Sequence, residues 1–94
     1  MNVLWTATAL EQLRAIHAYI SQHSELYARR TVDRLTARTK QIALFPNSGR
    51  VVAEFESENI REVVEGSYRI IYQISDDHID VAAVVHTAVR TPWR

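Results

Sequence analysis

The part of the chain that most constrains the fold is the stretch from Ile60 to His86. It contains three runs rich in Val, Ile and Tyr, which favour a pleated, half-buried surface. The runs are Ile60–Val64, Tyr68–Ile74 and Ile79–Val85. Glu65-Gly66-Ser67, the first connection, supplies a glycine for a positive φ, and residues 75–78 supply Ser and Asp side chains that close a turn. The stretch therefore predicts two successive hairpins and three antiparallel strands.

Alternation of side chains predicts the two faces of this sheet. One face is continuously apolar and carries Tyr68, Ile70, Tyr72 and Ile74 of the middle strand and Ile79, Val81, Ala83 and Val85 of the third. The other face mixes apolar side chains with Arg69, Gln73 and His86, so His86 is expected near Arg69. On a small domain, such a half-apolar second face is either thinly covered or binds a partner.

The composition indicates a single folded domain over residues 1–94. The chain is 47% apolar and has two glycines and two prolines, which is ordinary for a globular protein. It has no cysteine, which excludes disulfides and thiolate metal sites. The N-terminus lacks the pattern of a signal peptide, and no run approaches the roughly 18 apolar residues of a membrane span. We expect a cytoplasmic protein with no membrane partner.

The formal net charge is zero, but the charges are unevenly distributed along the chain. Residues 25–50 carry six basic and two acidic side chains, whereas residues 51–80 carry two basic and eight acidic ones. This asymmetry indicates that partners meet particular faces. The zero total argues against a protein that binds chiefly to phosphates.

Two helices are predicted before the sheet. Asn2–Trp5 is a short apolar run that can pair at the sheet edge, and Thr6 is a good N-cap for the first helix, which should end near Gln22 or His23. Ser24 is the expected N-cap of the second helix. Each helix has an apolar stripe at spacings of three and four: Ala9, Leu13, Ile16 and Ile20, then Ala28, Val32, Leu35, Thr39 and Ile42.

The second helix should end at Phe45-Pro46, because the residue before proline is pushed away from helical backbone angles. A turn and an extended segment, Arg50–Phe55, follow and can add a short strand. The predicted order is β-α-α-β-β-β with this optional extra strand. The fold class is α+β, with a helix hairpin packed on a small antiparallel sheet.

Several segments, taken in order, resemble the RelE/ParE superfamily, the toxins of bacterial type II toxin–antitoxin (plasmid stabilisation) modules. The resemblance covers nearly the whole chain and rests on the order and spacing of the segments. They are Trp5-Thr6, Phe45-Pro46-Asn47-Ser48-Gly49-Arg50, Glu54, Ile60-Arg61-Glu62-Val63, Tyr68-Arg69-Ile70-Ile71-Tyr72, Val84-Val85-His86 and Arg90.

The resemblance implies a cytoplasmic toxin that a cognate antitoxin wraps and neutralises. It leaves two targets open. The RelE-like branch is similar to ribosome-dependent ribonucleases that cut mRNA in the A site. The ParE-like branch is similar to poisons of DNA gyrase that have lost the nuclease residues.

For the RelE-like branch, the resemblance points to Arg69, Glu54 and His86 as catalytic residues. Metal-independent RNA cleavage needs a base, an acid and a cation for the phosphate, and an arginine can clamp a phosphate with two hydrogen bonds. The structural alternative is an ion pair of Arg69 with Glu54 or Glu62, and a strand-end role for His86. The order His86-Thr87 and the absence of a following tyrosine depart from the nuclease pattern.

Lysine content favours the ParE-like branch. Lys40 is the only lysine and is predicted on the second helix, so the lysines of the RelE pattern have no counterpart. A nuclease that works among ribosomal phosphates should also be strongly basic, and this chain is neutral. DNA gyrase is therefore the expected target, with the ribosome and mRNA as the alternative.

Partner-binding residues are predicted on the second helix and near the end of the chain. Arg30, Arg34 and Arg38 recur every four residues, which is typical either of a solvated helix face or of a docking stripe for an acidic partner. The predicted set also includes Arg61, Arg90 and Trp93. Trp93 either folds back on the sheet or is an exposed contact. The spacing of His17, His23 and His78 does not indicate a metal site, and no cofactor is expected.

Three hypotheses of different classes follow from the sequence. The chain is a toxin that acts by binding gyrase without chemistry of its own, or an mRNA endonuclease, or a structural or adaptor domain on the same fold. The third hypothesis stays open because a fold does not determine a function.

Overall fold

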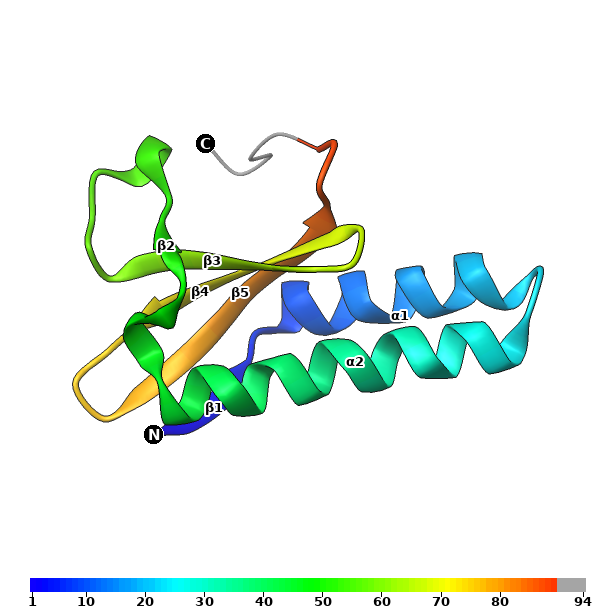
Figure 1. Ribbon diagram of the computed structural model, residues 1–94, viewed down its shortest axis with the longest axis horizontal. Coiled ribbons are helices and arrows are strands. Elements are labelled where there is room, and N and C mark those ends of the chain that lie inside the picture. Colours follow the sequence, from blue (N-terminus) through cyan, green and yellow to red (C-terminus); the bar gives the residue numbers. More distant parts are fainter. Residues whose placement is uncertain (90–94) are drawn as a thin grey trace.

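The computed structural model describes residues 1–89, which form two layers, a helix hairpin and a sheet (Figure 1). The helices are α1 (Ala7–Ser21) and α2 (Glu25–Leu44), and the strands are β1 (Asn2–Trp5), β2 (Arg50–Val51), β3 (Ile60–Glu65), β4 (Tyr68–Ile74) and β5 (His78–His86). Two 3₁₀ turns, Pro46–Ser48 and Ala53–Phe55, flank β2. The strand order is β1-β5-β4-β3-β2, in which β1 runs parallel to β5 and the other pairs are antiparallel. The predicted α+β class and element order, with the extra strand, are confirmed.

Both helices begin at the predicted caps. The Thr6 hydroxyl accepts a hydrogen bond from the Ala9 amide at 3.1 Å and donates one to the Val81 carbonyl at 2.9 Å, which ties the start of α1 to β5. The Ser24 hydroxyl accepts from the Tyr27 amide at 3.1 Å. Each cap satisfies an amide that the first helical turn leaves without a partner.

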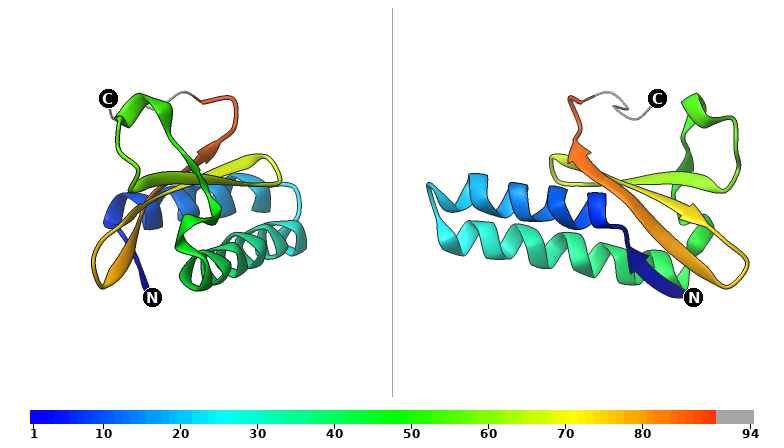
Figure 2. Two further views of the ribbon diagram at one scale, coloured as in Figure 1. Left: turned by 60° about the vertical axis from the view of Figure 1, so that its left-hand side comes forward. Right: turned by 180° about the vertical axis from the view of Figure 1, so that it is seen from behind.

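The main core lies between the helix hairpin and the sheet, and the two further views show the hairpin on one face of the sheet only (Figure 2). The helices contribute Ala9, Leu35 and Ile42, and the strands contribute Val63, Ile70, Tyr72, Ile79, Val81 and Val84. The far end of the hairpin, where α1 meets α2, extends beyond the sheet (Figure 1). The apolar stripes therefore account for the position of both helices.

A β-bulge changes the faces of β5 from those predicted. Ile71 lies opposite Ala83 and Tyr72 opposite Val81, so Ala82 is an extra residue in β5. After the bulge, Val84 joins the core on the helix side, while Ala83 packs on the other face. The prediction that Ala83 and Val85 share the face of Ile79 and Val81 is wrong, because uninterrupted alternation does not hold across the extra residue.

The second face of the sheet is covered in part by the chain itself. Val52 is 2% exposed and packs with Ile71 and Ala83, and Phe55 and Ile60 lie against this small cluster. The segment between β2 and β3 therefore supplies the thin cover that a half-apolar face needs.

Tyr72 fixes the end of α2 against the sheet. Its buried hydroxyl donates to the Pro46 carbonyl at 2.6 Å and accepts from the Gly49 amide at 3.0 Å. A Cβ at position 49 would lie 2.5 Å from that hydroxyl, so only glycine allows this close approach. This contact sets where the chain leaves the helix and enters β2.

We expect Leu35→Ala to lower the free energy of unfolding by about 2–5 kcal/mol, because a fully buried leucine leaves a cavity in the main core. Leu35 is 1% exposed, whereas Leu26 on the same helix is 54% exposed. Leu26→Ala is the matched control and should cost less than about 0.5 kcal/mol. Urea denaturation measures both, and equal losses would contradict the assignment of the buried face of α2.

Candidate functional site

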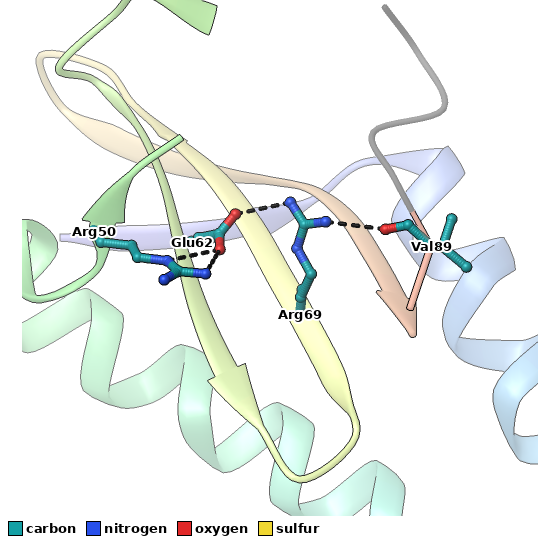
Figure 3. Close-up of polar contacts among 4 residues, drawn as sticks. All are labelled: Arg50, Glu62, Arg69 and Val89. Carbon is teal, nitrogen blue, oxygen red and sulfur yellow. Dashed lines mark hydrogen bonds and ion pairs between the residues drawn. The ribbon is translucent and has the colours of Figure 1, made fainter. Parts of the chain in front are cut away.

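Three strands place Arg50, Glu62 and Arg69 together on the face of the sheet opposite the helices (Figure 3). Arg50 of β2 lies directly opposite Glu62 of β3. Arg69 of β4 lies opposite Val64, one diagonal step from Glu62. We refer to these three residues as the arginine–glutamate cluster.

Each oxygen of the Glu62 carboxylate has its own arginine. Arg50 donates to Oε1 through Nε at 2.9 Å and Nη2 at 2.7 Å. Arg69 donates to Oε2 through Nη2 at 2.8 Å and uses Nη1 to reach the Val89 carbonyl at 3.0 Å. Figure 3 shows Arg69 between Glu62 and Val89. The cluster therefore joins three strands to the segment that follows β5.

Burial makes this pairing strong. The side chains of Glu62 and Arg69 are 5% and 13% exposed, whereas that of Arg50 is 75% exposed. Burial raises the pKa of Glu62, but the hydrogen bonds from Arg50 and Arg69 and the attraction of their charges outweigh it, so the pKa lies below its ordinary value. The carboxylate is thus ionised and fully engaged. Arg69 Nε is buried and has no partner among the described residues.

A hollow of about 310 Å³ opens beside the arginine–glutamate cluster. Glu54, Val64 and Thr87 complete its lining. Two arginines and two glutamates surround it, so their formal charges cancel. A phosphate entering this space would meet cations that carboxylates already neutralise. The hollow is polar, but it is poorly suited to bind an anion.

Of the three predicted catalytic residues, the structure brings together Arg69 and Glu54 but not His86. His86 lies opposite Tyr68 in the sheet, and the two rings pack edge to face with centroids 5.8 Å apart. Its Nδ1 accepts from the Ala88 amide at 3.1 Å. The prediction that His86 shares the face of Arg69 is wrong, because the bulge at Ala82 turns it to the face of Tyr68.

The arginines of α2 lie away from this hollow. Arg30 and Arg34 are exposed and form no hydrogen bond or ion pair within residues 1–89, while Arg38 donates to Gln41 at 2.9 Å. Arg34 and Arg38 line a groove of about 190 Å³ opposite Glu65 at the end of β3. The basic stripe therefore borders the β3–β4 hairpin.

Arg61 binds backbone carbonyls of the chain itself. It donates to the carbonyls of Gly49 at 2.9 Å, Asn47 at 3.3 Å and Glu58 at 2.9 Å, and so holds the turn that precedes β2. Arg90 and Trp93 lie outside the described residues.

Within the described part of the chain, no group of three or more His, Asp or Glu side chains is placed to hold a metal ion. No helix described here is long and apolar enough to cross a membrane.

Sequence reasoning missed Arg50 as a member of the site. It named Glu62 as one of two alternative partners of Arg69, and that pairing is confirmed. Arg50 belongs to the site because it lies opposite Glu62 in the sheet. A two-residue strand shows too little alternation for its register to be predicted from the sequence.

Comparisons with known proteins bear on both the family and the fold of this chain. Residues 3–90 match the family described as ParE toxin of type II toxin–antitoxin system, parDE. Toxin RelE2 of Caulobacter vibrioides is 36% identical over 88 residues, which cover 93% of this chain and 96% of that protein. In the solved chromosomal ParDE system from P. aeruginosa, a chain with 18% identity superposes with a TM-score of 0.73, covering 92% of this chain and 95% of that one. The YoeB dimer from Staphylococcus aureus gives a TM-score of 0.60 at 16% identity, over 88% and 92% of the two chains.

We expect Glu62→Gln to lower the free energy of unfolding near pH 7 by about 1.5–3 kcal/mol, because charge-assisted hydrogen bonds are lost. The pKa of Glu62 in the folded state lies below its ordinary value of 4.5. Its stabilisation is therefore fully present above that pH and is lost as the pH falls through the folded-state pKa.

Urea denaturation over a series of pH values measures this effect. Below pH 4.5 the stability of Glu62→Gln should fall less steeply than that of the parent chain. Glu58→Gln, at an exposed glutamate of the same segment, is the control and should keep the parent slope. Equal slopes for the parent chain and Glu62→Gln would contradict the assigned role of the carboxylate.

Proposed function

Since the chain belongs to the ParE toxin family of type II toxin–antitoxin systems, we propose that it inhibits growth by binding and poisoning DNA gyrase, without cutting RNA. Membership of the family implies a cognate antitoxin as partner. In this proposal the toxin acts in the cytoplasm, and the antitoxin neutralises it there.

The observation that carries the proposal is the engagement of Arg69. Both of its terminal nitrogens are already used, by the Glu62 carboxylate and the Val89 carbonyl. To clamp a phosphate, Arg69 would have to leave a buried carboxylate without one of its two partners, which is strongly unfavourable. This supports a structural role for Arg69.

The position of His86 supports the same conclusion. Metal-independent cleavage of RNA needs an acid and a base within reach of one phosphate, beside a cation that is free to bind it. His86 packs against Tyr68 on the helix side, while Arg69 and Glu54 border the hollow on the other side. The zero net charge also disfavours work among ribosomal phosphates.

The alternative is a RelE-like mRNA endonuclease, and one geometric observation favours it. Glu54 borders the same hollow as Arg69, so a carboxylate and an arginine do face one space. The name of the Caulobacter vibrioides relative, Toxin RelE2, points in the same direction. An endonuclease on this chain would need another acid in place of His86.

The basic stripe of α2 is proposed as a contact for an acidic partner. Arg30 and Arg34 are exposed and unpaired within residues 1–89, as a docking surface requires. Arg61 holds a turn, so its proposed contribution to binding is indirect, through the shape of that turn. Arg90 and Trp93 stay in the proposed partner-binding set on the sequence argument alone.

The target is tested with the purified chain in two assays. We expect inhibition of supercoiling by DNA gyrase or trapping of its cleaved DNA complex, and no codon-positioned cuts by primer extension in a translating extract. His86→Ala should leave both results unchanged, because the ring has no role in chemistry here. In a nuclease, loss of the catalytic cation typically lowers the rate on the order of 10²–10³-fold. Cuts in the A site that disappear in Arg69→Ala, with gyrase unaffected, would establish the alternative.

We expect the triple substitution of Arg30, Arg34 and Arg38 by Gln to weaken binding of the acidic partner roughly 3- to 150-fold, since each such pair contributes about 0.2–1 kcal/mol. The loss should shrink as salt is added, because exposed charges are screened. Arg14→Gln, at an exposed arginine of α1, is the control. Titration calorimetry with the antitoxin and with gyrase shows which of them uses the stripe, and unchanged affinity for both would contradict the proposal.

A further inference from the structure

His78 is the first residue of β5, and both nitrogens of its ring meet carboxylates. Nδ1 lies 2.7 Å from Oδ1 of Asp77, the last residue of the turn that follows β4, and Nε2 lies 3.1 Å from Oδ2 of Asp80 on β5. The ring therefore bridges the turn and the strand. Figure 1 shows this turn at the end of the sheet opposite to the tip of the helix hairpin. None of the three residues borders the hollow beside the arginine–glutamate cluster.

The geometry determines the charge of the ring. At neutral pH an aspartate carboxylate is ionised and only accepts hydrogen bonds. Each ring nitrogen of His78 must therefore donate one, which requires a proton on both nitrogens and a positive charge on the ring. A neutral ring would direct a lone pair at one of the two carboxylates and lose that contact.

The two carboxylates favour this charged form. Their hydrogen bonds, first that of Asp77 and then that of Asp80, raise the pKa of His78 above its ordinary value of 6.5. Burial opposes this rise, and the negative charges of the two carboxylates add to it. In turn, the hydrogen bond from His78 lowers the pKa of Asp77.

The neighbouring elements bring no second cation to the ring. The residues of β1 that lie opposite this part of β5 are Asn2 and Leu4, and Gln73 of β4 lies opposite Asp80. The turn contributes one more acidic residue, the exposed Asp76. The charged amino terminus of the chain donates to a carbonyl of α2 instead. The proton on the ring is thus held by carboxylates alone.

We propose that His78 is a pH-dependent latch for the β4–β5 turn. As an imidazolium it ties Asp77 to Asp80 and holds the turn closed, and after losing its proton it lets the turn open more often. The Ser75 amide donates to the His78 carbonyl at 2.9 Å and so reports on the closed turn. Because the pKa of the ring is raised in the closed turn, closure is fully favoured below pH 6.5 and weakens as the pH rises through that raised pKa.

Amide hydrogen exchange measures opening of the turn when it is expressed as protection relative to an unstructured chain at each pH. In the full chain, protection of the Ser75 amide should fall roughly two- to fivefold between about pH 5.5 and about pH 8.5, the range expected for an exposed ion pair. The fall should follow the titration of the His78 ring by NMR, with a midpoint above 6.5. The Ser48 amide, which donates to the Phe45 carbonyl in a turn without histidine, is the internal control and should keep constant protection.

Variants separate the latch from a general effect of pH. Asp77→Asn and Asp80→Asn each remove one charged acceptor and should lower the titration midpoint of His78. His78→Gln should show at every pH the low protection of Ser75 that the parent chain shows at high pH. His17→Gln, at an exposed histidine of α1, is the matched control and should keep the parent profile. The dispersion of amide shifts shows whether each variant folds, and if His78→Gln does not, the two Asn variants decide.

Three results would overturn the proposal. The first is protection of the Ser75 amide that does not change with pH in the parent chain. The second is a His78 ring that carries a single proton at neutral pH, as seen by nitrogen NMR of the imidazole. The third is a fall in protection that persists in His78→Gln, or a titration midpoint that neither Asn variant lowers.

Discussion

Glu62 is the one buried carboxylate among residues 1–89, and the sheet is organised around its need for partners. A buried charge is tolerated only when it is paired and its remaining lone pairs are satisfied. Arg50 and Arg69 meet that need from the two neighbouring strands, and Arg69 extends the link to Val89. This pairing joins the two-residue strand β2 to β3, in addition to the backbone pairing of the two strands. The same requirement keeps both terminal nitrogens of Arg69 engaged.

The bulge at Ala82 determines which side chains of β5 lie on each face of the sheet. One extra residue turns Val84 into the core and moves His86 to the side of Tyr68. If the same sequence continued its alternation without the bulge, His86 would lie on the face of the sheet that carries Arg69. The bulge therefore decides on which face His86 lies, whereas the ion pairs of Glu62 with Arg50 and Arg69 join β2, β3 and β4 and do not depend on it. Bulges are frequent next to functional sites for this reason.

The fold was predictable from the sequence because its determinants are local. The caps Thr6 and Ser24 and the stop at Phe45-Pro46 act within a few residues, and the apolar stripes fix which helix faces are buried. The site was less predictable because it depends on how each strand is aligned with its neighbours. The sequence alone does not mark Ala82 as an extra residue, and the register of a two-residue strand depends on the tertiary contacts of Arg50. Sequence reasoning therefore identified Glu62 as a possible partner of Arg69 but placed His86 on the wrong face.

Helix α2 separates two surfaces that differ in chemistry. On one flank, Arg34 and Arg38 face Glu65 across a polar groove beside the β3–β4 hairpin. On the other flank, Thr36, Lys40 and Ala43 line a groove that they share with Val3 and Trp5 of β1. The two sets are offset by two residues, which is about 200° around a helix of 3.6 residues per turn. A partner on one flank does not compete for the side chains of the other. Because the surfaces share no lining residue, substitutions on each flank should act independently, and a protein that binds both must wrap around the helix.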